Sequence, residues 1–153
     1  MKILFVCHGN ICRSPMAEFI FKKMLDERKL SDQFTVRSAA TSSEEIYMGN
    51  GKPVYPPAKA ELAKHGISCS GKTAVQLKSS DYAGYDLLIG MDSANIRNMN
   101  RICGGDPDGK IKKLLDFADG SDVADPWYTD RFDVTFRDIE KGCTALLDYL
   151  TKK

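Results

Sequence analysis

Apolar residues in this chain form short runs, separated by longer segments in which they recur every three or four positions. The first run covers residues 2–6 and is almost entirely apolar, with β-branched and aromatic side chains. Such a run predicts a strand that is buried on both faces, as in a parallel sheet covered by helices. Three further strands are predicted at residues 34–38, 87–91 and 111–114.

Segments with helical spacing lie between and after these runs. The first follows Ser14 and Pro15, which are expected to supply the helix cap and the first helical residue. The second covers residues 57–65 and should stop at Gly66, while Asp92 or Ser93 should cap a third helix that ends near residue 102. Residues 41–56 between the second strand and the second helix are expected to form a long polar loop.

The last helix has the clearest pattern in the chain, and Asp133 is placed to cap its start. One apolar stripe runs along it and is expected to face the core: Phe132, Phe136, Ile139, Cys143, Leu146, Leu147 and Leu150. Strands that alternate with helices predict an α/β fold, a doubly wound, Rossmann-like parallel sheet of four strands with helices on both faces. Residues 1–153 are expected to form one domain, with ligands at the carboxyl ends of the strands.

Composition narrows the classes of function. The chain has 22 basic and 21 acidic side chains, so no bulk charge attracts nucleic acid or an anionic membrane. Its N-terminal apolar stretch is too short for a signal peptide, and no run approaches the ~18 apolar residues of a membrane span. Five cysteines without a paired spacing argue against disulfides and zinc, and only His8 and His65 could add imidazole ligands. We therefore expect a cytoplasmic protein without metal or cofactor.

The residues from Cys7 to Pro15 join the first strand to the first helix, and their sequence is Cys-His-Gly-Asn-Ile-Cys-Arg-Ser-Pro. Backbone N–H groups of a tight loop at a helix N-terminus form a nest of the size of a phosphate. Gly9 and Asn10 are the residues that best tolerate unusual backbone angles there. Arg13 can hold two phosphate oxygens at once, and the same donors would favour Cys7 as a thiolate nucleophile.

These motifs allow two other interpretations. Cys7 could be an inert buried cysteine and Arg13 a surface charge, but the whole nine-residue string at one strand–helix junction disfavours that reading. A second stretch, from Gly66 to Thr73, fits the nucleotide-binding pattern G-x-x-x-x-G-K-T. A nucleotide loop follows a strand and opens a helix, whereas this stretch follows a predicted helix, so nucleotide binding is not expected.

The motif resembles the signature of the low-molecular-weight protein tyrosine phosphatases, Cys-x-Gly-Asn-x-Cys-Arg-Ser-Pro near the N-terminus. The resemblance covers essentially the whole chain. It continues through Ser38-Ala39-Ala40, His65-Gly66-Ile67, Met91-Asp92 and Asp125-Pro126-Trp127-Tyr128. It implies an enzyme that acts on phosphotyrosine-containing proteins through a phosphocysteine at Cys7 and releases inorganic phosphate.

The same resemblance assigns roles to individual residues. Asp125 matches the family's general acid and base, and Cys12 matches a partner that protects Cys7 through a reversible disulfide. A supporting hydrogen-bond network would contain Asn10, Ser14, Ser38 and His65, and the loop that binds phosphate would contain His8, Gly9, Asn10, Ile11, Cys12 and Arg13. Tyr47, Trp127 and Tyr128 could form apolar walls around the substrate ring.

Three alternatives remain open from the sequence. A bacterial branch of the family acts on phosphoarginine and typically has threonine where this chain has Ile11, which favours tyrosine here. A thiol-dependent arsenate reductase would need two further cysteines close together, but Cys69 and Cys103 are 34 positions apart. A binding module without turnover is disfavoured by the joint presence of Cys7, Arg13 and Asp125.

Overall fold

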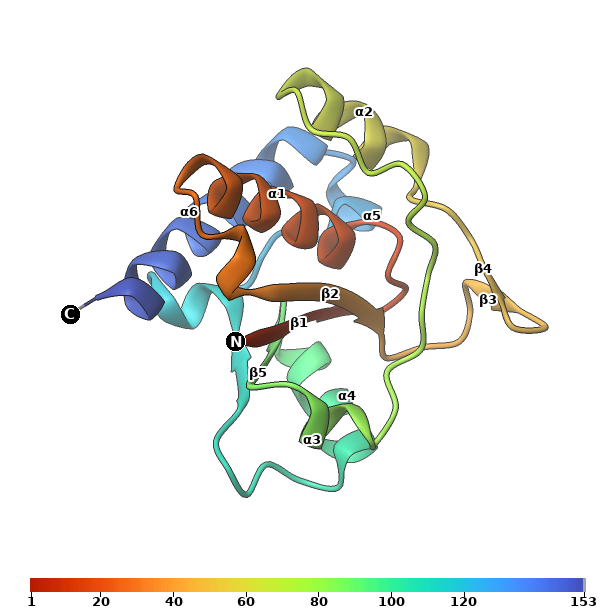
Figure 1. Cartoon of the computed structure of the whole chain (residues 1–153). Coiled ribbons are helices and arrows are strands. Elements are labelled where there is room, and N and C mark those ends of the chain that lie inside the picture. Colours follow the sequence, from red (N-terminus) through yellow and green to blue (C-terminus); the bar gives the residue numbers. More distant parts are fainter. Residues whose placement is uncertain (153) are drawn as a thin grey trace.

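The computed structural model describes residues 1–152 of the chain. Four parallel strands form its central sheet in the order β2-β1-β5-β6 (Figure 1). They are β1 (Lys2–Cys7), β2 (Thr35–Ala40), β5 (Leu87–Gly90) and β6 (Ile111–Lys113). The predicted α/β fold with a four-stranded parallel sheet is therefore confirmed.

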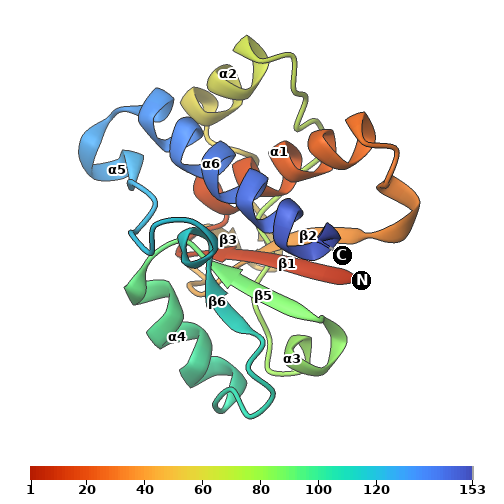
Figure 2. The ribbon, with the colours of Figure 1, turned by 90° about the vertical axis from the view of Figure 1, so that its left-hand side faces the viewer.

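Helices cover both faces of this sheet, as predicted. Figure 2 shows α1, α2 and α6 on one side of the strands and α3 and α4 on the other. The helices are α1 (Arg13–Glu27), α2 (Pro56–Lys64), α3 (Asp81–Gly84), α4 (Ser93–Cys103), α5 (Pro126–Thr129) and α6 (Phe132–Thr151). There are also two short 3₁₀ turns, η1 (Ser31–Gln33) and η2 (Leu114–Phe117). Among residues 1–152, no helix combines the length and apolar content that a membrane crossing requires.

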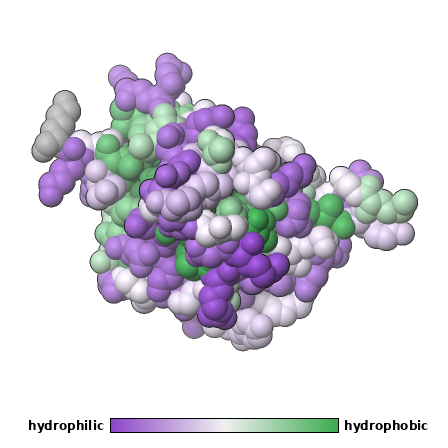
Figure 3. Space-filling view, turned by 90° about the horizontal axis from the view of Figure 1, so that it is seen from below, coloured by the Kyte–Doolittle hydropathy of each residue, from purple (hydrophilic) through white to green (hydrophobic). Residues whose placement is uncertain are grey.

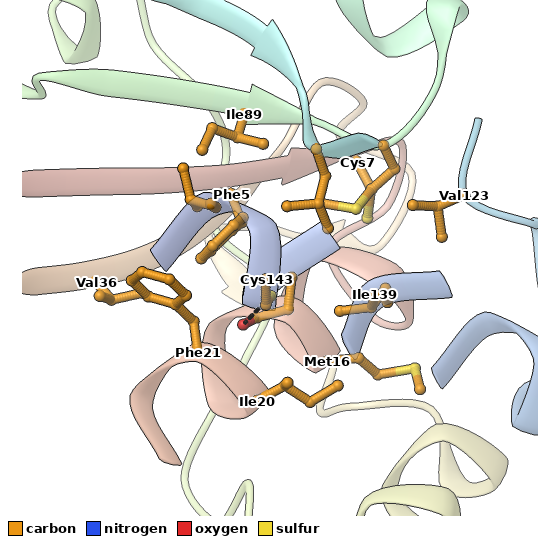
Figure 4. Close-up of a cluster of buried hydrophobic side chains, with 14 of the residues drawn as sticks. Phe5, Cys7, Met16, Ile20, Phe21, Val36, Ile89, Val123, Ile139 and Cys143 are labelled. Carbon is orange, nitrogen blue, oxygen red and sulfur yellow. Dashed lines mark hydrogen bonds between the residues drawn. The ribbon is translucent and has the colours of Figure 1, made fainter. Parts of the chain in front are cut away.

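The central strand β1 divides the hydrophobic interior into two cores. Ile3, Phe5 and Cys7 belong to the core under α1 and α6, whereas Leu4 and Val6 belong to the core on the α4 side. This division follows because successive side chains of a strand point to opposite faces. Figure 4 shows the first core, where side chains of the sheet meet those of α1 and α6. The last residue of β1 thus enters the loop with its sulfur already oriented by packing.

The order of the strands creates a natural ligand site. From β1 the chain passes to β2 at one edge and then returns across the sheet to β5, on the other side of β1. Ligands of such sheets bind at the carboxyl ends where the strand order reverses. The loop after β1 and the turn after β5 meet there, and Asp92 in that turn caps α4 by accepting a hydrogen bond from the Asn95 amide at 2.8 Å.

Two predicted helix caps are wrong. α1 begins at Arg13, its cap position is Cys12, and Ser14 lies within the first turn. α6 has Arg131 at its cap position without a side-chain capping bond, and Asp133 in the first turn pairs with that arginine at 3.0 Å. The reason is physical: the Ser14 hydroxyl contacts the cysteine sulfur of the loop, and the Asp133 carboxylate contacts a charged group instead of a backbone amide.

The segment expected to be a loop throughout, residues 41–56, contains a small hairpin. Its strands are β3 (Ile46–Tyr47) and β4 (Asn50–Gly51), joined by Met48 and Gly49, which both have positive φ angles of 49° and 83°. Two-residue turns of this conformation match the twist of paired strands. The hairpin projects beyond the body of the molecule (Figure 3). Strands of two residues each leave too short a pattern for the sequence to reveal.

Candidate active site

The loop between β1 and α1 is held in a conformation that depends on one asparagine. Asn10 has a φ of 58°, the left-handed region that asparagine tolerates better than most residues. Gly9 does not have a positive φ, contrary to the expected use of its freedom; a Cβ there would lie 3.2 Å from the Glu45 side chain. The Asn10 side chain is 1% exposed and faces the protein interior.

The Cys7 sulfur lies at the bottom of this loop and is surrounded by donors. Its side chain is almost buried, with the Ser14 hydroxyl 3.0 Å from Sγ. The backbone amides of Asn10 and Ser14 donate to the same sulfur at 3.3 and 3.4 Å. Asn10 Nδ2 donates to the Ser14 hydroxyl at 2.7 Å, and the hydroxyl in turn can donate to the sulfur at 3.0 Å or to the Ala39 carbonyl at 3.5 Å. Donors of this kind at a helix N-terminus stabilise a thiolate.

The Arg13 guanidinium is buried beside the loop between two carboxylates. Nη1 donates to Asp92 at 2.8 Å and to the Val123 carbonyl at 3.2 Å, and Nη2 donates to Asp125 at 3.4 Å. Burial alone would lower the pKa of Arg13, but the negative charges on Cys7, Asp125 and Asp92 outweigh it and raise that pKa. The guanidinium therefore stays charged, and its plane is fixed by contacts from two different loops.

Asp125 reaches the site from the segment that precedes α6. It is the cap of the short helix α5, where its Oδ1 accepts a hydrogen bond from the Trp127 amide at 3.0 Å. Its Oδ2 lies toward Arg13, and about a third of the side chain, 30%, remains exposed. A carboxyl group in this place is held firmly and can still exchange protons with a bound molecule.

These residues share one cleft of about 450 Å³. Its floor consists of the loop after β1, and its walls include Asp92, Asp125 and the aromatic residues Trp127 and Tyr128. The cleft is lined by Cys7, His8, Gly9, Ile11, Cys12, Arg13, Glu44, Glu45, Asp92, Ala94, Asn95, Asn98, Asp125, Trp127 and Tyr128. A nucleophilic sulfur, a fixed cation and a carboxyl group thus face one space large enough for an aryl phosphate.

Comparison with known proteins agrees with this geometry. Residues 2–153 match the family model described as low molecular weight phosphotyrosine protein phosphatase. The chain belongs to this family. It is 36% identical over 156 residues to the low molecular weight protein-tyrosine-phosphatase YfkJ of Bacillus subtilis, covering 100% of this chain and 97% of YfkJ.

Solved structures of the family superpose closely on this chain. The crystal structure of Bacillus subtilis YfkJ matches with a TM-score of 0.90 at 35% identity, over 99% of this chain and 95% of that one. The low molecular weight protein tyrosine phosphatase from Streptococcus pyogenes matches with a TM-score of 0.87 at 36% identity, over 99% and 94%. The YwlE arginine phosphatase matches with a TM-score of 0.86 at 28% identity, over 100% and 97%. Phosphatases for two kinds of substrate therefore share this fold, and the YfkJ and Streptococcus pyogenes enzymes are more similar to this chain in sequence than YwlE is.

Only part of the supporting network implied by the family resemblance contacts the phosphate loop in this phosphatase. Asn10 and Ser14 contact each other and the nucleophilic sulfur as described above. The Ser38 hydroxyl instead donates to Glu18 at 2.6 Å. His65 lies 3.2 Å from a Glu61 oxygen and stacks on the Phe136 ring with centroids 3.8 Å apart. The structure does not join Ser38 or His65 directly to the phosphate loop.

Two of the three aromatic residues that were expected to form walls of the site line the cleft. Trp127 and Tyr128 line the cleft and are exposed, and the Tyr55 ring lies 6.3 Å from the Trp127 ring, measured between centroids. Tyr47 lies on the projecting hairpin and is not among the lining residues. The segment that precedes the hairpin reaches the cleft instead through Glu44, whose carboxylate is 3.1 Å from His8 Nε2. The acidic residues of this rim were not expected from the sequence.

The stretch that imitates a nucleotide loop has a different use in this phosphatase. It follows α2, and its first residue, Gly66, has a positive φ of 72° just after the helix end. The Lys72 ammonium donates to the Ser38 carbonyl at 3.0 Å and points to the protein interior. Nucleotide binding by this stretch receives no support from its position.

Sequence reasoning missed two further contributors to the site. The sequence predicts Asp92 only as a helix cap at a strand end, although its carboxylate makes the shortest contact to Arg13. Its position directly after a buried strand was the available signal, because the carboxyl ends of β1 and β5 lie side by side. Val123, whose carbonyl accepts from the same guanidinium, carried no signal in the sequence.

Proposed function

We propose that this phosphatase hydrolyses phosphotyrosine in proteins through a covalent phosphocysteine at Cys7. The observation that carries the proposal is the convergence of two backbone amides and the Ser14 hydroxyl on the Cys7 sulfur, at the floor of a cleft shared with Arg13 and Asp125. Residues 1–153 would act as one catalytic unit.

In the first step the Cys7 thiolate attacks phosphorus, so that an S–P bond forms while the bond between phosphorus and the tyrosine oxygen breaks. The Asp125 carboxyl group gives its proton to the departing phenolate. In the second step the Asp125 carboxylate takes a proton from water, the water oxygen binds phosphorus, and the S–P bond breaks. Inorganic phosphate leaves and the thiolate is restored. Arg13 and the loop amides hold the phosphoryl oxygens throughout.

Phosphotyrosine is favoured over phosphoarginine by the apolar Ile11 in the cleft lining. We expect higher kcat/KM on a phosphotyrosine peptide than on the matching phosphoarginine peptide, with a phosphoserine peptide slowest because its phosphate sits on a shorter side chain. Ile11→Thr should lower the ratio of tyrosine to arginine activity by about tenfold, the size of effect that one side chain has in a specificity pocket. Ile11→Val, which keeps the wall apolar, is the control. A preference for phosphoarginine in the unmodified protein would contradict the proposal.

We also propose that Cys12 protects the nucleophile. It lies in the same cleft lining as Cys7, and burial together with the negative charge of Cys7 raises the pKa of Cys12 to about 12. Oxidation of Cys7 to a sulfenic acid removes the negative charge that helps to raise this pKa. The Cys12 sulfur can then attack the sulfenic sulfur, with loss of water, to form a disulfide. All five cysteines are free in the structure, which suits a reducing compartment such as the cytoplasm.

Peroxide treatment tests this protective role. Peptide mapping should find a Cys7–Cys12 disulfide, and activity should return with dithiothreitol. In Cys12→Ser the recovered activity should fall by about tenfold or more, because the sulfenic acid proceeds to irreversible sulfinic and sulfonic acids. Cys69→Ser, which changes a buried cysteine outside the cleft, is the matched control. Equal recovery in both variants would contradict the role of Cys12.

A thiol relay of the arsenate reductase type is not supported. Cys69 packs in the core on the α1 side of the sheet, whereas Cys103 packs at the core on the α4 side. The central sheet thus lies between the two additional cysteines.

A further inference from the structure

A carboxylate lies buried between α1 and β2, one helical turn after Ser14. The Glu18 side chain is 5% exposed. One of its oxygens accepts the Ser38 hydroxyl at 2.6 Å, and the other accepts the Lys22 ammonium at 2.5 Å. The Lys72 ammonium lies 3.9 Å from Glu18. A buried carboxylate is tolerated only when such partners surround it.

Lys72 is the less usual member of this cluster. Only 11% of its side chain is exposed, compared with 37% for Lys22. Its ammonium donates to the Ser38 carbonyl of β2 at 3.0 Å, in addition to its contact with Glu18. Lysine keeps its charge in water wherever its flexible stem allows, so an ammonium held in this interior place indicates a structural or electrostatic use.

The segment that begins at Lys72 supports the phosphate loop directly. The Val75 amide donates to the Asn10 side chain at 3.0 Å, and the Val75 carbonyl accepts the Ala40 amide at 2.7 Å. Gln76 Nε2 donates to the carbonyls of Ala40 and Thr41 at 3.1 Å each. This segment therefore ties the left-handed residue of the loop to the carboxyl end of β2, and Lys72 anchors its first residue.

Charges also link Lys72 to the nucleophile. Burial lowers the pKa of Lys72, the negative charges of Glu18 and Cys7 oppose that shift, and the positive charges of Lys22 and Arg37 reinforce it. Coupling between two sites is reciprocal. If an ionised Cys7 favours the charged form of Lys72, a charged Lys72 favours the ionised form of Cys7.

We propose that Lys72 is a positioning residue for the reaction at Cys7. Its ammonium, held by Glu18 and the Ser38 carbonyl, anchors the segment that supports the phosphate loop and adds positive charge to the field at the sulfur. The inference rests on the proposed role of Cys7 as nucleophile. Lys72, which belongs to the nucleotide-loop-like stretch from Gly66 to Thr73, would thus support catalysis instead of binding a nucleotide.

The test compares Lys72→Met with Lys22→Met, which removes the other, more exposed ammonium from the same carboxylate. The measured quantity is the rate of iodoacetamide alkylation of Cys7 as a function of pH, followed by peptide mapping. In Lys72→Met the alkylation midpoint should move to higher pH, where the proton concentration is about three- to tenfold lower than at the wild-type midpoint. Its kcat on a phosphotyrosine peptide should fall by about 10- to 100-fold through displacement of the loop. Lys22→Met should change neither by more than about twofold.

Two further variants keep the result interpretable. Lys72→Arg retains the charge and should restore the alkylation midpoint, although kcat stays reduced if the larger head displaces the segment. Glu18→Gln with Lys72→Met removes both buried charges, which keeps the protein folded if the single variant is unstable. Because the two lost charges have opposite signs, its midpoint should stay near that of the wild type, while its kcat should remain low because the anchor of the segment is lost. A midpoint in Lys72→Met identical to that in Lys22→Met would overturn the proposal, and so would a wild-type kcat in the double variant. A wild type that never forms phosphocysteine would instead refute the proposed function, because alkylation does not require turnover.

Discussion

Cys7→Ser should lower kcat on aryl phosphates by about 10⁴- to 10⁶-fold, the size of loss that follows removal of a covalent nucleophile. The serine hydroxyl keeps its proton at neutral pH, so the three donors around position 7 no longer face an anion. Arg13 and the loop amides remain, and therefore binding of inorganic phosphate should persist. Steady-state hydrolysis of p-nitrophenyl phosphate and calorimetric phosphate titration measure the two properties.

The control is Cys103→Ser, which makes the same chemical change at a partly buried cysteine at the end of α4, outside the cleft. It should retain activity within about twofold. Acid-quenched wild-type enzyme should show a phosphoryl adduct bound through sulfur on the peptide that contains Cys7. Normal turnover in Cys7→Ser would remove the covalent step from the proposed function.

The sequence could predict those parts of the site that are local. The loop from Cys7 to Ser14 is a continuous segment, so its motif, its helix and its nucleophile can be identified without knowledge of distant contacts. The sheet could also be predicted, because strands buried on both faces are nearly all apolar. The observed boundaries of helices and strands differ from the predicted ones by one or two residues where a polar side chain could contact either a backbone amide or another group. Ser14, for example, matches a capping residue in sequence and contacts the sulfur in space.

Contacts between distant segments could not be predicted in this way. His65 and Lys72 lie only seven positions apart, and either could face the phosphate loop; the turn at Gly66 decides that Lys72 reaches β2 while His65 stacks on α6. Asp92 and Asp125 resemble ordinary capping residues, and both are caps. Their second use arises only because strand order and the segment before α6 bring them to one guanidinium. Asp92 could be predicted as a cap from its neighbours and Asp125 as a catalytic residue from the family resemblance, but neither could be predicted as a partner of Arg13.

Asp125→Asn should lower kcat/KM by about 100- to 10,000-fold on substrates with poor leaving groups, the usual contribution of a general acid. The amide keeps a hydrogen-bond acceptor for the Trp127 amide, so the start of α5 should remain in place. It cannot give a proton to the phenolate. A series of aryl phosphates with leaving groups of increasing acidity measures the effect, which should shrink toward unity for the most acidic phenols.

Asp92→Asn separates acid catalysis from the positioning of Arg13. Asp92 lies closer to the guanidinium than Asp125 does, at 2.8 Å against 3.4 Å. Loss of the Asp92 negative charge should therefore leave Arg13 less well positioned to bind the phosphoryl oxygens. The resulting fall in kcat/KM should be similar for all leaving groups. Asp133→Asn, at an exposed carboxylate paired with Arg131 in the first turn of α6, should change nothing. If the leaving-group dependence follows Asp92 and not Asp125, the proton donor is the residue after β5, and the carboxylate before α5 serves to orient the arginine.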